Sequence, residues 1–206
     1  MNKNQVIATG AILCLFSLVG ALLVGLIYEL TFERIIVEER NVLLQTLNSL
    51  IAQDRYDNAL TEDTLTLQDP LLSRKPVTLY RARLQQQPVA VVISAIAPDG
   101  YNGAIKLLIA INMDERLAGV RVVSHKETPG LGDKIEIQKS AWITQFQGAS
   151  LSRPASNRWT VKKDGGEFLQ LTGATITPRA IIKAVHKALT YFKQHKTDIF
   201  SASNHT

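Results

Sequence analysis

A long apolar stretch without a charged residue, Val6–Tyr28, lies near the start of the chain. About 20 helical residues cross the hydrocarbon core of a bilayer, so this stretch predicts a transmembrane helix. Lys3 and the amino terminus precede it, whereas Glu29 and Glu33 follow it. Because positive charge favours the cytoplasmic side of a membrane, we expect the N-terminus in the cytoplasm and the body of the chain outside it.

A cleaved signal peptide is the alternative interpretation of this stretch. The apolar run is long, however, and it lacks a small-x-small cleavage site at its end. A lipoprotein site is also disfavoured, because the bulky Leu13 precedes Cys14. We therefore expect residues 1–29 to form a cytoplasmic N-terminus and an uncleaved single-pass anchor.

The next segment has the periodicity of an amphipathic helix. Leu43, Leu47 and Leu50 recur at helical spacing, and Glu38–Asn41 supply a polar side. This pattern predicts a stalk helix over residues 30–51. Arg55–Pro70 is polar and mixed, so residues 30–75 are assigned to the stalk and a connection.

A change of period then indicates strands. Pro76–Pro98 predicts two strands around Gln85–Gln87, and Gly103–Met113 and Leu117–Ser124 predict two more. Strands that follow one another through short turns favour an antiparallel sheet over alternation with helices.

The last third of the chain predicts shorter elements and a terminal helix. Ser140–Phe146 reads as a short helix, and a hairpin is expected around Asp164–Gly166. The final helix is predicted from Pro178 to about Gln194, and its apolar residues recur at helical spacing. The fold class is therefore α+β, with the sheet and C-terminal helix in a domain over residues 76–197 and a flexible tail over 198–206.

Composition narrows the possible functions. The chain has 206 residues and a formal charge of +5, and its basic residues are scattered, so nucleic-acid binding is not indicated. Cys14 is the only cysteine, which excludes an intrachain disulfide and disfavours a cysteine-ligated metal. The four histidines lack the spacing of a metal site, and no metal is expected.

The segment Thr172–Pro178 is the strongest candidate for a ligand site. Thr177 can cap a helix, and Pro178 suits the first helical position. Gly173 and Ala174 permit close approach of a bound group, and a helix N-terminus favours a phosphate. An ordinary capped helix start is the alternative that these residues alone leave open.

Two other loops follow predicted strands, where they can converge with this segment. They are Ala97–Gly103 and Ser124–Lys134. The Glu127–Gly132 part of the second loop is compatible either with a wide hairpin connection or with a ligand-binding loop. Asp99, Glu127 and Asp133 are compatible with paired carboxylates or with turn residues.

Catalytic patterns are not evident. His125 has no cysteine partner and no serine nucleophile in a strained elbow, and His186 and His195 are expected to be solvated. The chain also lacks a G-x-G-x-x-G segment and a Walker A loop. No residue is therefore assigned a catalytic role.

Several segments together resemble a known family. Thr172–Thr175 (TGAT) resembles the [Ser/Thr]-Gly-Ala-Thr flavinylation motif of the C subunit of the sodium-translocating NADH:quinone reductase and the G subunit of the Rnf (Rsx) complex. The likeness extends over nearly the whole chain and is closer to the Rnf G subunit. Besides the anchor, it is carried in order by Arg55–Leu60, Asp99–Ile105, His125–Glu136 and Val161–Gly166.

The resemblance implies a cofactor and a role. In this family FMN is joined through its phosphate to the fourth residue of the motif, here Thr175, by a separate flavin transferase that uses FAD. The protein would carry electrons in an ion-translocating oxidoreductase that links ferredoxin and NAD. It would sit with other subunits in the bacterial inner membrane, with its C-terminal domain in the periplasm.

Contacts for the flavin can also be expected. The Thr128–Leu131 loop, which contains Gly130, should lie against the isoalloxazine ring with Leu131 as an apolar contact, and Glu127 and Tyr101 are further expected contacts. Thr172 and Thr177 are expected to hydrogen-bond within the turn that also contains Gly173 and Ala174. Lys162 or Lys163 would offset phosphate charge or remain solvated.

Two other functions remain possible on sequence grounds. One is a membrane-tethered, non-redox binding or scaffold module of the same type of complex. The other is a tethered hydrolase, for which a nucleophile–base pair is lacking.

Overall fold

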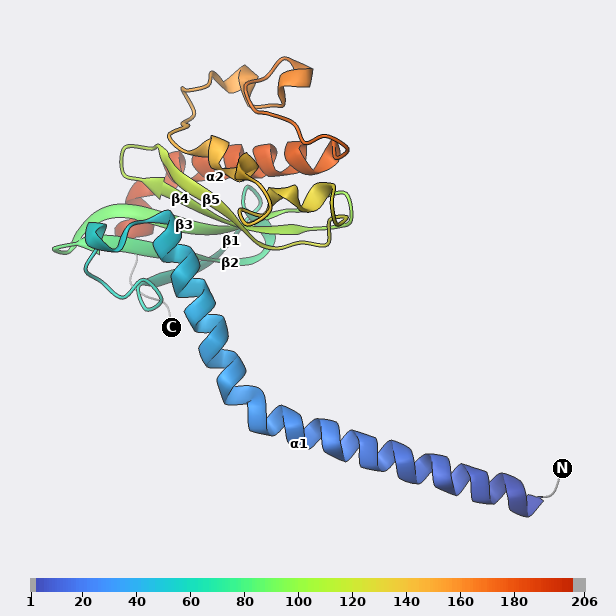
Figure 1. The fold of residues 1–206 in the computed structure, drawn as a ribbon. Helices are drawn as coiled ribbons and strands as arrows, with labels where there is room; N and C mark the ends of the chain where they lie inside the picture. The colour runs from blue at the N-terminus through green and yellow to red at the C-terminus, as the bar shows by residue number, and fades with distance from the viewer. Residues whose placement is uncertain (1–2, 202–206) are drawn as a thin grey trace. The chain divides into compact units, whose positions relative to one another are not determined.

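The computed structural model describes residues 3–201. Helix α1 spans Lys3–Leu50 without interruption (Figure 1), so the expected anchor and stalk form one helix. Among the described residues, α1 is the one helix long and apolar enough to cross a membrane. The chain divides after Leu43 into two compact units, and the second contains the sheet and the C-terminal helix.

A five-stranded antiparallel sheet forms the centre of the second unit. Its strands follow the chain order, β1-β2-β3-β4-β5, and each neighbouring pair is antiparallel. The α+β prediction is confirmed. The strands are β1 (Thr64–Asp69), β2 (Ser73–Leu84), β3 (Gln87–Ala97), β4 (Ile105–Asn112) and β5 (Leu117–Ser124).

Strand β1 was not predicted, because its segment was interpreted as a polar connection. It is a short edge strand, and its residues other than Leu65 remain at least partly exposed. An edge strand needs only one paired side and tolerates polar residues, so its hydrophobic signal is weak.

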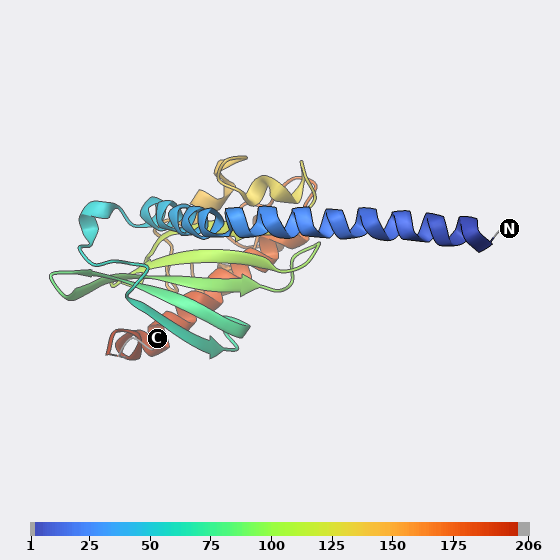
Figure 2. The ribbon, with the colours of Figure 1, turned by 90° about the horizontal axis from the view of Figure 1, so that it is seen from below.

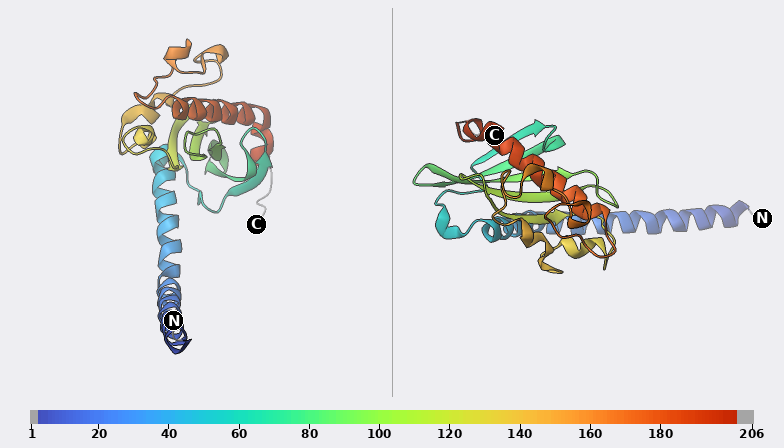
Figure 3. Two further views of the ribbon diagram at one scale, coloured as in Figure 1. Left: turned by 90° about the vertical axis from the view of Figure 1, so that its right-hand side faces the viewer. Right: turned by 90° about the horizontal axis from the view of Figure 1, so that it is seen from above.

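The sheet is covered on both faces. Helix α2 (Ile176–Ser201) lies across one face (Figures 2 and 3), where Ile93, Leu107 and Ile109 join its apolar stripe in one core. The last turn of α1 packs on the opposite face, since a Cβ added at Gly119 would lie 3.0 Å from Leu50 Cδ2. Burial on both faces explains why β3 and β4 are apolar almost throughout.

The connection between β5 and α2 is mostly irregular. It contains the short 3₁₀ helices η2 (Gly132–Ile135), η3 (Ala141–Phe146), η4 (Ser156–Arg158) and η5 (Lys162–Asp164). Helix η3 confirms the short helix expected there. The hairpin expected around Asp164–Gly166 is wrong, because η5 occupies that segment and Val161 and Phe168 form only an isolated parallel bridge.

Helix α2 is longer than predicted at both ends. It begins at Ile176 rather than Pro178 and extends through Ser201 rather than ending near Gln194. Residues 202–206 of the expected tail lie outside the described residues.

Candidate functional site

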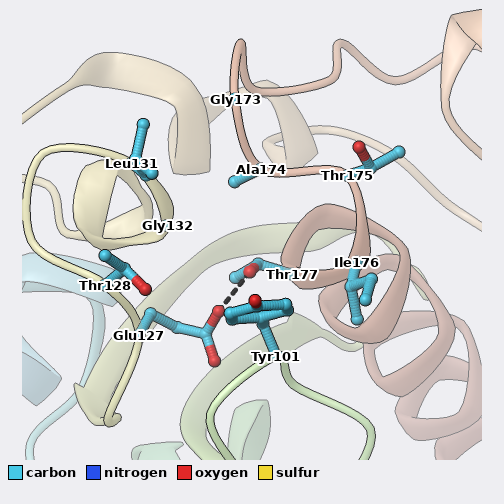
Figure 4. Close-up of a pocket in the computed structure, with 10 residues that line it drawn as sticks. All are labelled: Tyr101, Glu127, Thr128, Leu131, Gly132, Gly173, Ala174, Thr175, Ile176 and Thr177. Carbon is cyan, nitrogen blue, oxygen red and sulfur yellow. Dashed lines mark hydrogen bonds between the residues drawn. The ribbon is translucent and has the colours of Figure 1, made fainter.

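One cavity gathers three loops that are far apart in the sequence. It has a volume of about 350 Å³, within the range of about 300–1,000 Å³ typical of small-molecule sites. Figure 4 shows the β5–η2 loop on one side and the turn before α2 on the other. Its lining residues are Tyr101, Glu127, Thr128, Leu131, Gly132, Gly173, Ala174, Thr175, Ile176 and Thr177.

Thr175 directly precedes α2 and its side chain is exposed at the edge of this cavity (Figure 4). The free N–H groups of the first helical turn and the positive end of the helix dipole are therefore beside its hydroxyl. This is the position at which a helix stabilises a phosphate.

The turn that presents Thr175 depends on Gly173. Its φ is +83°, in the left-handed region, and a Cβ there would lie 2.8 Å from Leu131 Cδ2. The N–H of Ala174 closes the turn by donating to the carbonyl of Leu171 at 3.2 Å. A larger residue at position 173 would therefore strain the backbone and displace Leu131.

Glu127 lies at the bottom of the cavity and is 4% exposed. Its Oε2 accepts a hydrogen bond from the Thr177 hydroxyl, and its Oε1 accepts one from the backbone N–H of Asn102 at 3.1 Å. Two loops and the first turn of α2 thus meet at one carboxylate. The expectation that Thr177 caps the helix is wrong, because Thr177 is fully buried inside the first turn and its hydroxyl is directed to Glu127.

Apolar side chains surround the opening of the cavity. Tyr101, Leu131 and Ile176 are 65%, 44% and 46% exposed, which is unusual for large apolar groups placed together. Thr128 accepts a hydrogen bond from the side-chain amide of Asn102 at 3.1 Å, which joins the first two loops.

Most of the residues expected at the site are brought together here, but Thr172 and Gly130 do not line the cavity. Gly130 takes part as a turn residue with φ +78°. Gly132 and Ile176 also line the cavity; both belong to the candidate segments, but neither was named among the expected contacts. A Cβ added at Gly132 would lie only 2.9 Å from Glu127 Cβ, so a glycine is needed at this position.

Arg179 is a further residue that sequence reasoning missed. Its Nε and Nη2 donate to the two carboxylate oxygens of Asp164 at 2.6 and 2.9 Å, and its Nη1 donates to the Thr175 carbonyl at 3.3 Å. Arg179 follows Thr175 by one helical turn, and that spacing was the available signal. Lys162 and Lys163, beside Asp164, are exposed.

The other candidate groups lie apart from one another. Asp99 pairs with Lys183 and Asp133 pairs with Lys139, each at 2.9 Å, and these hydrogen bonds hold the pKa of both carboxyls below the usual range. They do not form an acid–base pair with Glu127.

His125 and His186 have structural surroundings. The Nδ1 of His125 accepts the N–H of Glu127 at 3.0 Å, so its Nε2 carries the proton toward Glu136 at 2.8 Å. His186 is half-buried against Trp159 rather than solvated, and burial lowers its pKa.

Comparison with known proteins identifies the family. The FMN-binding domain family matches residues 100–190, which include the whole cavity lining, and the RnfG N-terminal region family matches residues 1–50. The G subunit of the ion-translocating oxidoreductase complex of Shewanella oneidensis is 46% identical over 97% of this chain and 95% of its own. The corresponding protein of Vibrio cholerae is 46% identical over 95% of this chain and 94% of its own.

The chain belongs to the family of G subunits of ion-translocating oxidoreductase complexes. The resemblance to the Rnf G subunit is thereby confirmed. The chain is an electron-transport subunit of such a complex, it carries an FMN-binding domain, and α1 is suited to anchor it in a membrane.

Proposed function

We propose that this protein carries FMN covalently attached to Thr175 through a phosphoester and passes electrons through it. The observation that carries the proposal is the position of the Thr175 hydroxyl, exposed at the start of α2 and on the edge of the cavity of the FMN-binding domain. A phosphodiester keeps one negative charge, which the helix N-terminus stabilises.

The residues present fit FMN. Leu131, Ile176 and Tyr101 offer apolar surface for a flat ring system, while Glu127 and Thr128 offer polar contacts. The flavin, when bound, supplies reversible transfer of electrons, and the protein's part is to hold it and set its electrostatic surroundings. A covalent link keeps a carrier loaded in a compartment where free flavin would be lost.

Attachment requires a donor and a separate transferase. In the proposed reaction with FAD, a bond forms between the Thr175 hydroxyl oxygen and the phosphorus of the FMN half. The pyrophosphate bond to the AMP half breaks and AMP leaves, and a base of the transferase takes the hydroxyl proton. Thr175 is exposed, so a second protein can reach it.

The wider arrangement is also part of the proposal. Residues 1–29 would anchor the chain in the bacterial inner membrane, residues 30–75 would form the stalk and connection, and residues 76–197 would bind FMN in the periplasm. The complex would link ferredoxin and NAD, and this chain would have no complete active site on its own.

The intact mass of the purified chain, co-expressed with a flavin transferase, tests the attachment. We expect the mass of one FMN phosphoryl adduct and a fluorescent band on a denaturing gel, both lost in Thr175→Ala. Thr172→Ala is the matched control, because Thr172 is also exposed but does not line the cavity.

Two results would contradict the proposal. Fluorescence that persists in Thr175→Ala and disappears in Thr172→Ala or Thr177→Ala would show that another threonine is used. An unmodified mass in the presence of the transferase would instead favour a non-redox binding or scaffold module.

A further inference from the structure

Glu127 is a buried carboxylate whose two hydrogen-bond donors are neutral. The donors are the Thr177 hydroxyl and the Asn102 backbone N–H. Within residues 3–201, no Lys, Arg or His side chain forms a salt bridge with it. Burying a carboxylate without a cation is costly, and this carboxylate lies in the lining of the binding cavity, which points to a functional role.

The surroundings hold this carboxylate in one place. A Cβ at Gly100 would lie 2.9 Å from Glu127 Oε1, and a Cβ at Gly132 would lie 3.0 Å from Glu127 Oε2. Both oxygens are thus enclosed by backbone and are held by donors from another loop and from the first turn of α2. The negative charge cannot turn away from a ligand in the cavity without breaking these contacts.

We propose that the Glu127 carboxylate lowers the reduction potential of the bound flavin. The inference rests on the proposed function, in so far as FMN must occupy this cavity. Reduction of a flavin ring takes up two electrons from an external reductant and one proton from water. The ring then carries one additional negative charge. A fixed negative charge in a water-poor cavity opposes that addition, because Coulomb repulsion is weakly screened there.

A redox titration of the full, flavin-loaded chain in detergent, with dithionite as the reductant, tests the proposal. Glu127→Gln keeps the size of the side chain and removes the charge, so the midpoint potential should move to a more positive value. Thr177→Val removes a donor that partly neutralises the carboxylate, so the midpoint should move to a more negative value. A purely structural role would not produce shifts of opposite sign.

Asp99→Asn is the matched control. Asp99 precedes Gly100, but its side chain is 57% exposed and paired with Lys183, outside the cavity. Removing this solvated charge should leave the midpoint potential within error of the unsubstituted chain.

An unchanged or more negative midpoint in flavin-loaded Glu127→Gln overturns the proposal. If that variant does not retain flavin, the shift of the midpoint potential in Thr177→Val decides alone. An unchanged or more positive midpoint potential in Thr177→Val then overturns the proposal. A flavin-free unsubstituted chain would be a failure of the proposed function itself, which the absorption spectrum reveals before any titration.

Discussion

At the scale of single residues, Arg179 is the group best placed to act on a phosphate at Thr175. Its guanidinium is oriented by Asp164 and contacts the Thr175 carbonyl. Its planar, always charged group gives directed hydrogen bonds to a phosphate, which a lysine cannot reproduce.

We therefore predict that Arg179→Gln slows attachment of FMN to Thr175. Charge-assisted hydrogen bonds contribute about 1.5–3 kcal/mol, so a loss of about 10- to 150-fold in rate is expected. The measurement is the appearance of the adduct mass with time at fixed transferase and FAD. Lys187→Gln, farther along α2, is the control, and an equal effect of both variants would contradict a local role.

At the scale of elements, buried charges tie the end of α2 to the sheet. Arg81 is 1% exposed, its Nε donates to Asp63 at 2.6 Å, and its Nη1 donates to the Ile199 carbonyl at 3.1 Å. Arg83 likewise joins Asp63 at 2.8 Å and the Phe200 carbonyl at 3.1 Å. The last carbonyls of α2 thus receive donors from β2, which complements the helix dipole.

Asp63→Asn should destabilise the domain strongly. The substitution removes a carboxylate from a buried arginine, and breaking such a pair typically costs about 3–5 kcal/mol. Urea unfolding followed by circular dichroism would measure the loss. Asp114→Asn removes an exposed pair with Arg116 and should cost less than about 1 kcal/mol, and a similar cost for both variants would refute the prediction.

The burial of His186 should make the stability of the folded domain depend on pH. Burial lowers its pKa in the folded state below the value of about 6.5 expected in the unfolded chain. The folded state then binds fewer protons, so its stability is full above the unfolded pKa and falls as pH drops toward the lowered folded pKa. Thermal midpoints between pH 7 and 5 should fall less in His186→Asn, and equal slopes would contradict this.

The elements show what sequence patterns can predict. The strands β2 to β5 and helix α2 have strong apolar periodicity and were predicted, whereas β1 is a half-exposed edge with little signal. The Asp164–Gly166 segment suggested a hairpin turn, but Gly165 instead ends a 3₁₀ helix with φ +82°. Local turn residues do not distinguish these outcomes, because packing against the rest of the chain decides between them.

The site was partly predictable for a related reason. Thr175 and the Glu127–Leu131 loop belong to contiguous motifs, so the sequence shows them. The bond between Thr177 and Glu127 joins residues 50 positions apart, and the expected role of Thr177 as a cap was derived from its neighbours alone. Long-range pairing of this kind requires the fold.

At the scale of the whole molecule, the order of anchor and body determines which compartment holds the flavin. The apolar stretch is flanked by positive charge before it and by acidic residues after it, and it lies within α1. This asymmetry supports a cytoplasmic N-terminus and a body on the other side of the membrane.

Labelling of intact cells tests this topology. Lys75→Cys, an exposed position beside the β1–β2 turn, should react with a membrane-impermeant maleimide in a Cys14→Ser background. Lys3→Cys in the same background should react only after the membrane is permeabilised. The reverse pattern would place the body in the cytoplasm.

The exposed position of Thr175 also has a consequence for biogenesis. Its hydroxyl lies on the surface of the finished domain, while the turn that presents it depends on the packing of Leu131 and Thr177. The acceptor conformation therefore exists only after folding, yet remains reachable from outside. On the proposed topology, the polypeptide can cross the membrane without cofactor, fold, and only then be loaded, which makes cofactor insertion a check that folding has succeeded.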